Sequence, residues 1–225
     1  MNKYDEKKGK SVTIAMDGPA GSGKSTVARC VAEKLGLLYL DSGAMYRAVT
    51  VLAIDNKVEK NKSKLIELVK KCNIEFKNNG KTIYLNNEDV SERIRSQEVN
   101  LLVADIAKVP EIRKEIVAHQ VRIGEKGNII AEGRDLTTIV FPHADFKFYL
   151  DASVQERAKR RFADLQAQHV NTTLKDVELE ISERDKKDIS REHSPLKAAA
   201  DAIVVDTTGK TIEEVVDIIV SSVKK

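Results

Sequence analysis

The sequence is poor in cysteine and contains no long apolar run. Its two cysteines, Cys30 and Cys72, lack the spacing of a metal site or a redox pair, which argues against a disulfide framework and favours reduced thiols in a cytosolic protein. No stretch approaches the roughly 20 apolar residues of a membrane-spanning helix. Residues Met1–Lys10 are polar and charged, unlike a secretory signal. We therefore expect a cytoplasmic protein without a membrane segment.

The sequence also lacks an excess of either charge. It contains 38 Lys and Arg residues against 35 Asp and Glu residues, which gives a net charge of +3. This balance points to neither nucleic acid nor a membrane surface as a partner, so anion binding would require local placement of basic side chains. With 41% hydrophobic and 32% charged residues in a chain of 225, the composition is typical of a globular enzyme with a sizeable core.

Five short apolar runs, mostly of β-branched or aromatic residues, predict the strands of a parallel sheet. They are nearly continuous rather than alternating, which is typical of strands buried on both faces. Helical stretches separate the runs, so we expect a doubly wound α/β core whose carboxyl edge binds the ligand. The runs are Val12–Met16, Leu37–Leu40, Asn128–Ala131, Phe146–Leu150 and Ala202–Val205, and the carboxylates that follow them are Asp17, Asp41, Glu132, Asp151 and Asp206.

One segment breaks the alternation of strand and helix. A helical stretch at Ser63–Lys71 is followed by two short runs, Ile74–Phe76 and Ile83–Leu85, around the turn residues Asn78–Gly80. This is the pattern of a β-hairpin whose turn needs positive φ angles. We interpret residues 56–99 as a small inserted antiparallel β/α subdomain and residues 159–175 as a short lid. The core would then comprise residues 11–55, 100–158 and 176–225.

The segment Gly18-Pro19-Ala20-Gly21-Ser22-Gly23-Lys24-Ser25 fits the phosphate-binding pattern G-x-x-x-x-G-K-[ST]. It follows a predicted strand and opens a predicted helix, as that loop requires. Its glycines let backbone N–H groups converge on phosphate oxygens, and the helix adds the positive end of its dipole. In such a loop Lys24 reaches the β- and γ-phosphates, and Ser25 offers its hydroxyl to Mg²⁺.

Other classes of nucleotide-binding protein carry the same loop. A GTPase also needs N-K-x-D at a strand end, whereas Asn56–Glu59 ends in glutamate within a polar stretch. An ATPase motor usually has four apolar residues followed by carboxylates that hold Mg²⁺, and Lys147–Asp151 is only a weak version of that pattern. Both classes are therefore disfavoured.

Arginines are placed where they would surround a second phosphate ligand. Guanidinium groups bind phosphate bidentately and stay charged, so they relieve the repulsion between two phosphate chains. A monophosphate acceptor is already mostly dianionic and needs no general base. One set, Arg184, Asp188 and Arg191, has the i, i+4, i+7 spacing of a single helical stripe. Any one arginine could equally cover a solvated helix face. The arginines are Arg47, Arg113, Arg134, Arg157, Arg160, Arg161, Arg184 and Arg191.

The motifs, taken in order, resemble bacterial cytidylate kinases, which are P-loop nucleoside monophosphate kinases. The resemblance runs from about Val12 to Ser222, and its most specific parts are D-S-G-A-x-Y-R and G-R-D. The segments that carry it are Gly18–Ser25, Leu40–Arg47, Pro110–Arg113, Gly133–Asp135, Glu183–Arg191 and Ser194–Leu196.

The resemblance implies a P-loop NTPase core with a five-stranded parallel sheet, and an ATP-dependent transfer of a phosphoryl group to CMP or dCMP with Mg²⁺ as cofactor. Residues Gly18–Thr26 would bind ATP, with Ser25 on the metal. Asp135 would accept a hydrogen bond from the cytosine amino group and Arg113 would donate to the ring acceptors, so UMP should be a poorer acceptor. The implied CMP-binding residues are Ser42, Arg47, Arg113, Arg134, Asp135, Arg184, Asp188 and Arg191, and the implied catalytic residues are Lys24, Arg134, Arg157, Arg161 and Arg191.

Two residues depart from the family pattern, and both bear on the choice of acceptor. Ala104 replaces a serine that would help to hold cytosine, and Thr137 stands where glycine is frequent. The preference among CMP, dCMP and UMP is therefore open. Alternatives are another small-molecule kinase, such as an adenylate, uridylate or shikimate kinase, or a nucleotide-gated binding protein. We expect a monomer that binds ATP and CMP or dCMP, with neither nucleic acid nor a membrane as partner.

Overall fold

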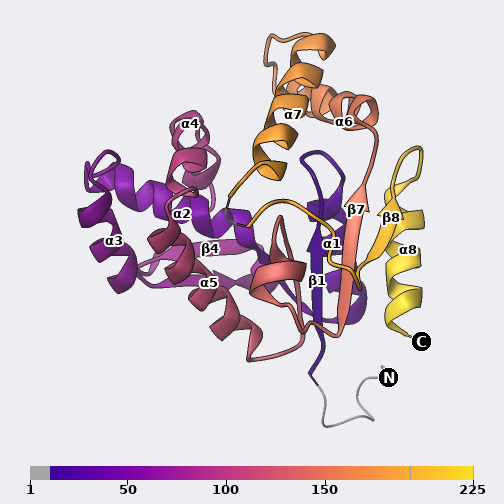
Figure 1. Cartoon of the computed structure of the whole chain (residues 1–225), viewed down its shortest axis with the longest axis horizontal. Coiled ribbons are helices and arrows are strands. Elements are labelled where there is room, and N and C mark those ends of the chain that lie inside the picture. The colour runs from indigo at the N-terminus through magenta and orange to yellow at the C-terminus, as the bar shows by residue number, and fades with distance from the viewer. Residues whose placement is uncertain (1–10, 193, 225) are drawn as a thin grey trace.

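The computed structural model describes residues 11–192 and 194–224, and the segment Met1–Lys10 lies outside them. Within them a five-stranded sheet has the order β2-β6-β1-β7-β8, and every neighbouring pair is parallel (Figure 1). The five predicted apolar runs are these five strands, so the expected parallel α/β core is confirmed. The strands are β1 (Thr13–Asp17), β2 (Leu38–Asp41), β6 (Ile129–Gly133), β7 (Phe146–Asp151) and β8 (Ile203–Asp206).

Helices cover both faces of this sheet because its central strand is apolar on both sides. Ile14 and Met16 pack with α1 (Lys24–Leu35) and α8 (Ile212–Val223) on one face. Ala15, between them, belongs to the core on the opposite face, which is formed with α2 (Ser42–Asp55) and α5 (Pro110–Gly124). Alternate residues of β1 therefore serve two cores, as expected for a strand buried on both faces.

Polar residues at the strand ends start the helices that follow. Asp41 caps α2 by accepting a hydrogen bond of 2.9 Å from the amide of Ala44. Thr211 and Glu214 form a capping box at the start of α8. Such caps satisfy the free amides of the first helical turn, and they fix where α2 begins after β2 and where α8 begins after β8.

The inserted segment forms a small antiparallel sheet beside helices α3 (Lys62–Lys71) and α4 (Gln97–Ile106). The turn between its first two strands contains Asn78, Asn79 and Gly80, all with positive φ as predicted. The third strand was not predicted, because its two residues, Glu and Asp, carry no apolar pattern. The elements of the insert between those helices are β3 (Ile74–Lys77), η1 (Asn78–Gly80), β4 (Thr82–Leu85), β5 (Glu88–Asp89) and η2 (Arg93–Arg95).

Two further helices, α6 (Val154–Ala167) and α7 (Leu174–Ile189), stand together beyond the carboxyl edge of the large sheet (Figure 1). Ala158, Val177 and Ile181 form a small separate core between them. The residues of the predicted lid, 159–175, form the second part of α6, the connection to α7 and the first two residues of α7. In the part of the chain that is described, no helix has the length and apolar character needed to cross a membrane.

Candidate functional site

The loop between β1 and α1 lies at the carboxyl edge and buries its lysine. Gly23 is the N-cap of α1, and Lys24 is the first helical residue. The Lys24 ammonium donates a hydrogen bond of 3.0 Å to the carbonyl of Pro19, within the same loop. Burial, followed by the positive charge of Arg134, lowers the pKa of Lys24 to about 7. This lysine is therefore poised to gain a proton when negative charge arrives.

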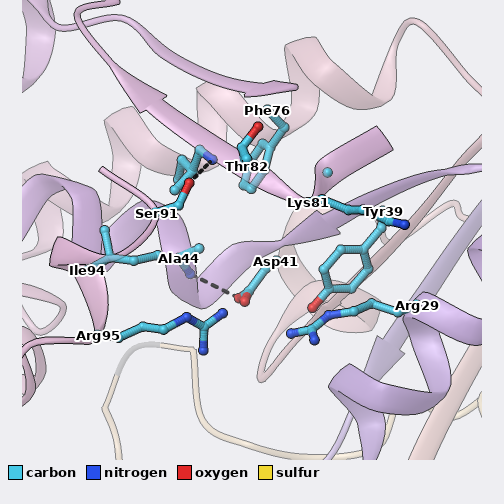
Figure 2. A pocket seen from close by; sticks show the side chains of 12 residues that line it. Arg29, Tyr39, Asp41, Ala44, Phe76, Lys81, Thr82, Ser91, Ile94 and Arg95 are labelled. Carbon is cyan, nitrogen blue, oxygen red and sulfur yellow. Dashed lines mark hydrogen bonds between the residues drawn. The ribbon is translucent and has the colours of Figure 1, made fainter. Parts of the chain in front are cut away.

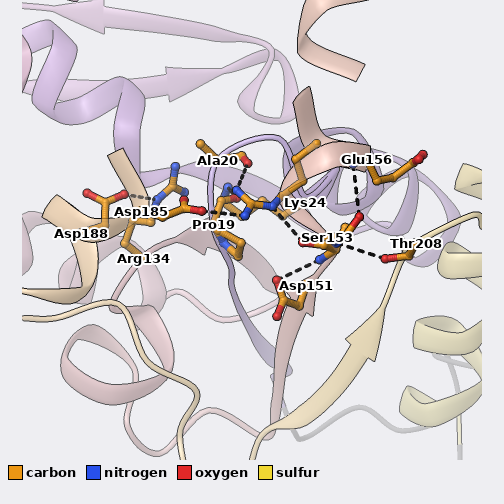
Figure 3. A network of polar contacts seen from close by, with 12 residues as sticks. Pro19, Ala20, Lys24, Arg134, Asp151, Ser153, Glu156, Asp185, Asp188 and Thr208 are labelled. Atoms are coloured by element: carbon orange, nitrogen blue, oxygen red, sulfur yellow. Dashed lines mark hydrogen bonds and ion pairs between the residues drawn. The ribbon is translucent and has the colours of Figure 1, made fainter. Parts of the chain in front are cut away.

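Side chains from two other elements hold carbonyl groups of the same loop. Arg157 of α6 donates a hydrogen bond of 3.0 Å to the carbonyl of Ala20. The hydroxyl of Thr207, just after β8, lies 3.2 Å from the carbonyl oxygen of Ser22, and Arg160 donates to that hydroxyl at 3.1 Å. Three carbonyls of the loop are therefore held by side chains, those of Pro19, Ala20 and Ser22. Figure 3 shows part of this network around Ala20 and Lys24.

Oxygen-bearing side chains gather beside Ser25. Its hydroxyl donates a hydrogen bond of 2.7 Å to Glu132 Oε1 at the end of β6, and the Tyr39 hydroxyl reaches the same oxygen at 3.3 Å. Burial and the nearby charge of Glu132 raise the pKa of Asp41 to about 6. Across residues 11–192 and 194–224, no group of three or more His, Cys, Asp or Glu side chains is placed to hold a metal ion. A hydroxyl and a carboxylate are nevertheless ligands suited to Mg²⁺.

Asp17, at the end of β1, fixes the turn that follows β6. It accepts hydrogen bonds from the amides of Leu136 at 2.9 Å and Thr137 at 2.7 Å, and from the Thr137 hydroxyl at 2.6 Å. At the start of this turn, a Cβ added to Gly133 would lie 2.3 Å from Ser42 Oγ, so a larger residue would force the Ser42 side chain to move. The turn places Arg134 close enough to Lys24 for its charge to lower the pKa of that lysine.

Arg113 and Asp135, the two residues expected to recognise a base, form a buried ion pair. The Arg113 guanidinium also lies 5.4 Å from the centre of the Tyr46 ring and donates a hydrogen bond of 3.3 Å to the carbonyl of Ala107. Ala104, which departs from the family pattern, is exposed on α4. The structure thus brings together the two residues that the resemblance implied, Arg113 from α5 and Asp135 from the turn after β6.

Asp188 of α7 links two further arginines. It is buried, accepts a hydrogen bond of 3.0 Å from Arg134 Nε, and accepts another from Arg191. The prediction that Arg191 continues the helical stripe is wrong, because α7 ends at Ile189 and Ser190 is its C-cap. Arg191 reaches Asp188 from the segment just after the helix.

Three more of the expected arginines, Arg184, Arg47 and Arg161, differ in their contacts and exposure. Desolvation, then repulsion from Arg134, lowers the pKa of Arg184, although its side chain still reaches solvent. Arg47 donates to the carbonyl of Ile94 at 3.1 Å, and burial, then the positive charges of Arg95 and Arg161, lowers its pKa, while Asp41 opposes that shift. Arg161 is exposed on α6.

A cavity of about 300 Å³ lies between the core and the insert. Figure 2 shows the guanidinium groups of Arg29 and Arg95 pointing toward each other across the space next to Asp41. Sequence reasoning assigned no role to either arginine. It also missed Thr207, whose position directly after a strand-ending carboxylate, Asp206, was an available signal.

Comparisons with known proteins place this geometry in a family. A family model described as cytidylate kinase matches residues 14–225. A cytidylate kinase of Lactococcus lactis subsp. cremoris (strain MG1363) is 48% identical over 218 residues, which cover 96% of this chain and 99% of that protein. One of Clostridioides difficile (strain 630) is 46% identical over 214 residues, covering 95% and 98%.

A solved structure supports the fold alone. It is described as an uncharacterized protein from Eubacterium ventriosum ATCC 27560, and it superposes with a TM-score of 0.55 at 13% sequence identity. The superposition covers 96% of this chain and 99% of that chain. At this identity the likeness extends to the arrangement of helices and strands.

Proposed function

Since the chain belongs to the cytidylate kinase family, whose members move a phosphoryl group from ATP to CMP or dCMP, we propose that the two nucleotides meet end to end at the carboxyl edge of its large sheet. The observation that carries this placement is electrostatic. Arg134 and Arg184 lie close enough to Lys24 to lower its pKa, so groups for the acceptor lie beside the loop for ATP. This chain is accordingly an ATP-dependent nucleoside monophosphate kinase.

On the donor side, residues Gly18–Thr26 bind the phosphates of ATP. Backbone amides of the loop and the N-terminus of α1 supply fixed positive dipoles. Lys24 supplies a positive charge that contacts the β- and γ-phosphates. The holding of the carbonyls of Pro19, Ala20 and Ser22 by side chains supports this role, because it keeps the loop open as an anion cradle.

Ser25 and Glu132 are the residues that would hold Mg²⁺ with ATP. Their oxygens already lie 2.7 Å apart in a hydrogen bond, at the end of β6 and the start of α1. When bound, the ion supplies positive charge that offsets the charge developing on the phosphate oxygens. Asp41, near Glu132, adds a second carboxylate on the same side of the site.

On the acceptor side, Arg113 and Asp135 read the cytosine. Their ion pair is buried, so a base inserted there must satisfy the hydrogen bonds that it displaces. The carboxylate accepts from the cytosine amino group, whereas uracil would present an oxygen to it. Arg184 and Asp188 hold the ribose hydroxyls, and the phosphate contacts Ser42 and the arginines Arg47, Arg134 and Arg191.

The chemistry is an in-line transfer without a general base. The acceptor phosphate is already anionic, and the arginines Arg134, Arg161 and Arg191 with Lys24 offset its repulsion from ATP and the charge of the transition state. Residues 56–99 close over CMP, and residues 159–175 close over ATP and exclude water, which limits hydrolysis of ATP. We also place the enzyme in the cytoplasm, on the strength of its cysteine usage, and expect it to be a monomer.

The deciding experiment measures ADP formation with CMP, dCMP, UMP, AMP and shikimate as separate acceptors. CMP and dCMP should give the highest kcat/KM, with UMP lower by the cost of one mismatched buried contact, roughly 1–3 kcal/mol. A higher rate with AMP or shikimate would reassign the acceptor. ATP consumption that needs a protein partner instead of CMP would favour a nucleotide-gated binding protein.

Lys24→Ala tests the placement of ATP. Removal of the lysine should cost at least about 100-fold in kcat, as expected when a preorganised charge at the transition state is lost. The affinity for CMP, measured by calorimetry, should change far less. A kcat within a few-fold of the parent enzyme would show that the ATP phosphates bind elsewhere.

A further inference from the structure

Arg157 is fully engaged by protein groups. Only 3% of its surface is exposed, and each of its donor nitrogens has a separate partner. Nε donates to the carbonyl of Ala152 at 2.9 Å, one terminal nitrogen donates to the carbonyl of Ala20 at 3.0 Å, and the other donates to the Asp185 carboxylate at 2.6 Å. A guanidinium held at three points by its rigid fork cannot swing without breaking several bonds.

The bond to Ala20 determines where the next amide points. In a planar trans peptide the carbonyl of one residue and the N–H of the next point in opposite directions. A carbonyl of Ala20 held outward by Arg157 therefore directs the N–H of Gly21 away from α6. The close packing supports this, since a Cβ added to Gly21, whose φ is 77°, would lie 3.1 Å from both the Cβ and the carbonyl oxygen of Arg157.

Asp185 in turn has one partner among the described residues. Its Oδ2 accepts from Arg157, while its Oδ1 is buried without a hydrogen-bond partner in the described structure. The ion pair is largely closed to solvent, with 4% of the Arg157 side chain and 13% of the Asp185 side chain exposed. A carboxylate is costly in such a place unless it is paired. Figure 3 shows Asp185 near Ala20 and Lys24, with Asp188 beside it on α7.

We propose that Asp185 is a positioning residue for ATP: through Arg157 it holds the carbonyl of Ala20 outward and so orients the amide of Gly21 toward the phosphates. Asp185 touches neither nucleotide. The inference rests on the proposed ATP site, and it changes the interpretation of Arg157 from a catalytic residue to a fixed support beneath the loop.

Asp185→Asn tests the proposal because it keeps the shape and removes the charge. The KM for ATP should rise roughly 10-fold, in keeping with the weakening of one charge-assisted hydrogen bond, while the KM for CMP stays within about 2-fold. Glu183→Gln, an exposed position on the same helix, is the matched control and should leave both KM values unchanged. A purely structural ion pair would lower the Tm without this difference between the two substrates.

A second variant, Arg157→Lys, keeps the test valid if Asp185→Asn is unstable, and the two together make a double-mutant cycle. Arg157→Lys retains the charge but cannot reach three partners, so it should raise the KM for ATP by a similar factor. Combined with Asp185→Asn it should add little, because both changes break the same unit. Independent, multiplying effects on the KM for ATP would overturn the proposal. If Lys24→Ala also left turnover unaffected, the ATP site itself would be misplaced, whereas normal sensitivity to Lys24→Ala with no effect of Asp185→Asn would refute the positioning role alone.

Discussion

ATP binding should take up a proton at Lys24. In the free protein burial, then Arg134, lowers the pKa of this lysine to about 7, with Arg184 acting in the same direction and Glu132 and Asp17 opposing it. The phosphates of ATP bring negative charge to the ammonium and raise its pKa toward the ordinary value of 10.5. Above about pH 7 the free lysine is mostly neutral, so binding has to protonate it.

The size of the effect follows from the pKa of the free protein. At pH 8 about 0.9 of Lys24 is neutral, so about 0.9 proton should be absorbed per ATP, against about 0.1 at pH 6. The affinity should fall as pH rises, by up to about tenfold per pH unit between pH 7 and 9. Asp41, with a pKa of about 6, has lost its proton before this range begins. Above pH 7.5, proton uptake on ATP binding therefore reports on Lys24 and not on Asp41.

Calorimetry provides the measurement. A non-hydrolysable ATP analogue with Mg²⁺ is titrated at pH 8 in buffers of different ionisation enthalpy, and the dependence of the observed heat on that enthalpy counts the protons. Lys24→Arg is the matched control, because a guanidinium stays charged at every pH used and should absorb none. If the parent enzyme absorbs no proton at pH 8, Lys24 is already charged in the free protein and the reasoning from its burial fails.

Three further substitutions test the acceptor side and the core. Asp135→Asn should reduce the preference for CMP over UMP by roughly 5- to 100-fold, as the ratio of kcat/KM values measures, because the buried carboxylate that accepts from the cytosine amino group is lost. Gly133→Ala should weaken CMP binding at least about 10-fold with ATP affinity kept, because its Cβ would meet Ser42 Oγ at 2.3 Å; unchanged CMP affinity by calorimetry would contradict this. Phe148→Ala, at a fully buried position, should lower the free energy of unfolding by about 3–5 kcal/mol in urea titrations, and a loss below about 1 kcal/mol would mean that the core closes around the gap.

The strands could be predicted from sequence because burial on both faces leaves a local mark. Ile14, Ala15 and Met16 are all apolar, and that continuity distinguishes them from the residues of an exposed strand. The order of the strands leaves no such mark. That β6 lies between β1 and β2 depends on contacts between residues about 90 to 120 positions apart, for which the local pattern holds no information.

For the site, sequence could identify the chemistry of a residue but not the direction of its side chain. The resemblance implies that Arg157 is catalytic, yet it adjoins Ala158 in the core of the helix pair and binds Asp185, 28 residues away. Helical spacing alone cannot separate an arginine that faces a cleft from one that braces a loop. Arg191 was placed on a helix for a similar reason, since the spacing continued past Ile189, where the helix ends.

Several cations at the carboxyl edge of the free protein lie close enough to repel one another. Lys24, Arg47 and Arg184 all have lowered pKa values, each because of desolvation first and then of neighbouring cations, although Arg184 is exposed. Asp188 relieves this only locally, since its two oxygens are taken by Arg134 and Arg191. Two phosphate chains would supply negative charge at this edge. The cations that repel one another in the free protein would then hold donor and acceptor together. Of these three cations, Lys24 should respond most to the arrival of phosphate, because a lysine with a pKa of about 7 can lose its proton in the free protein, whereas an arginine stays charged.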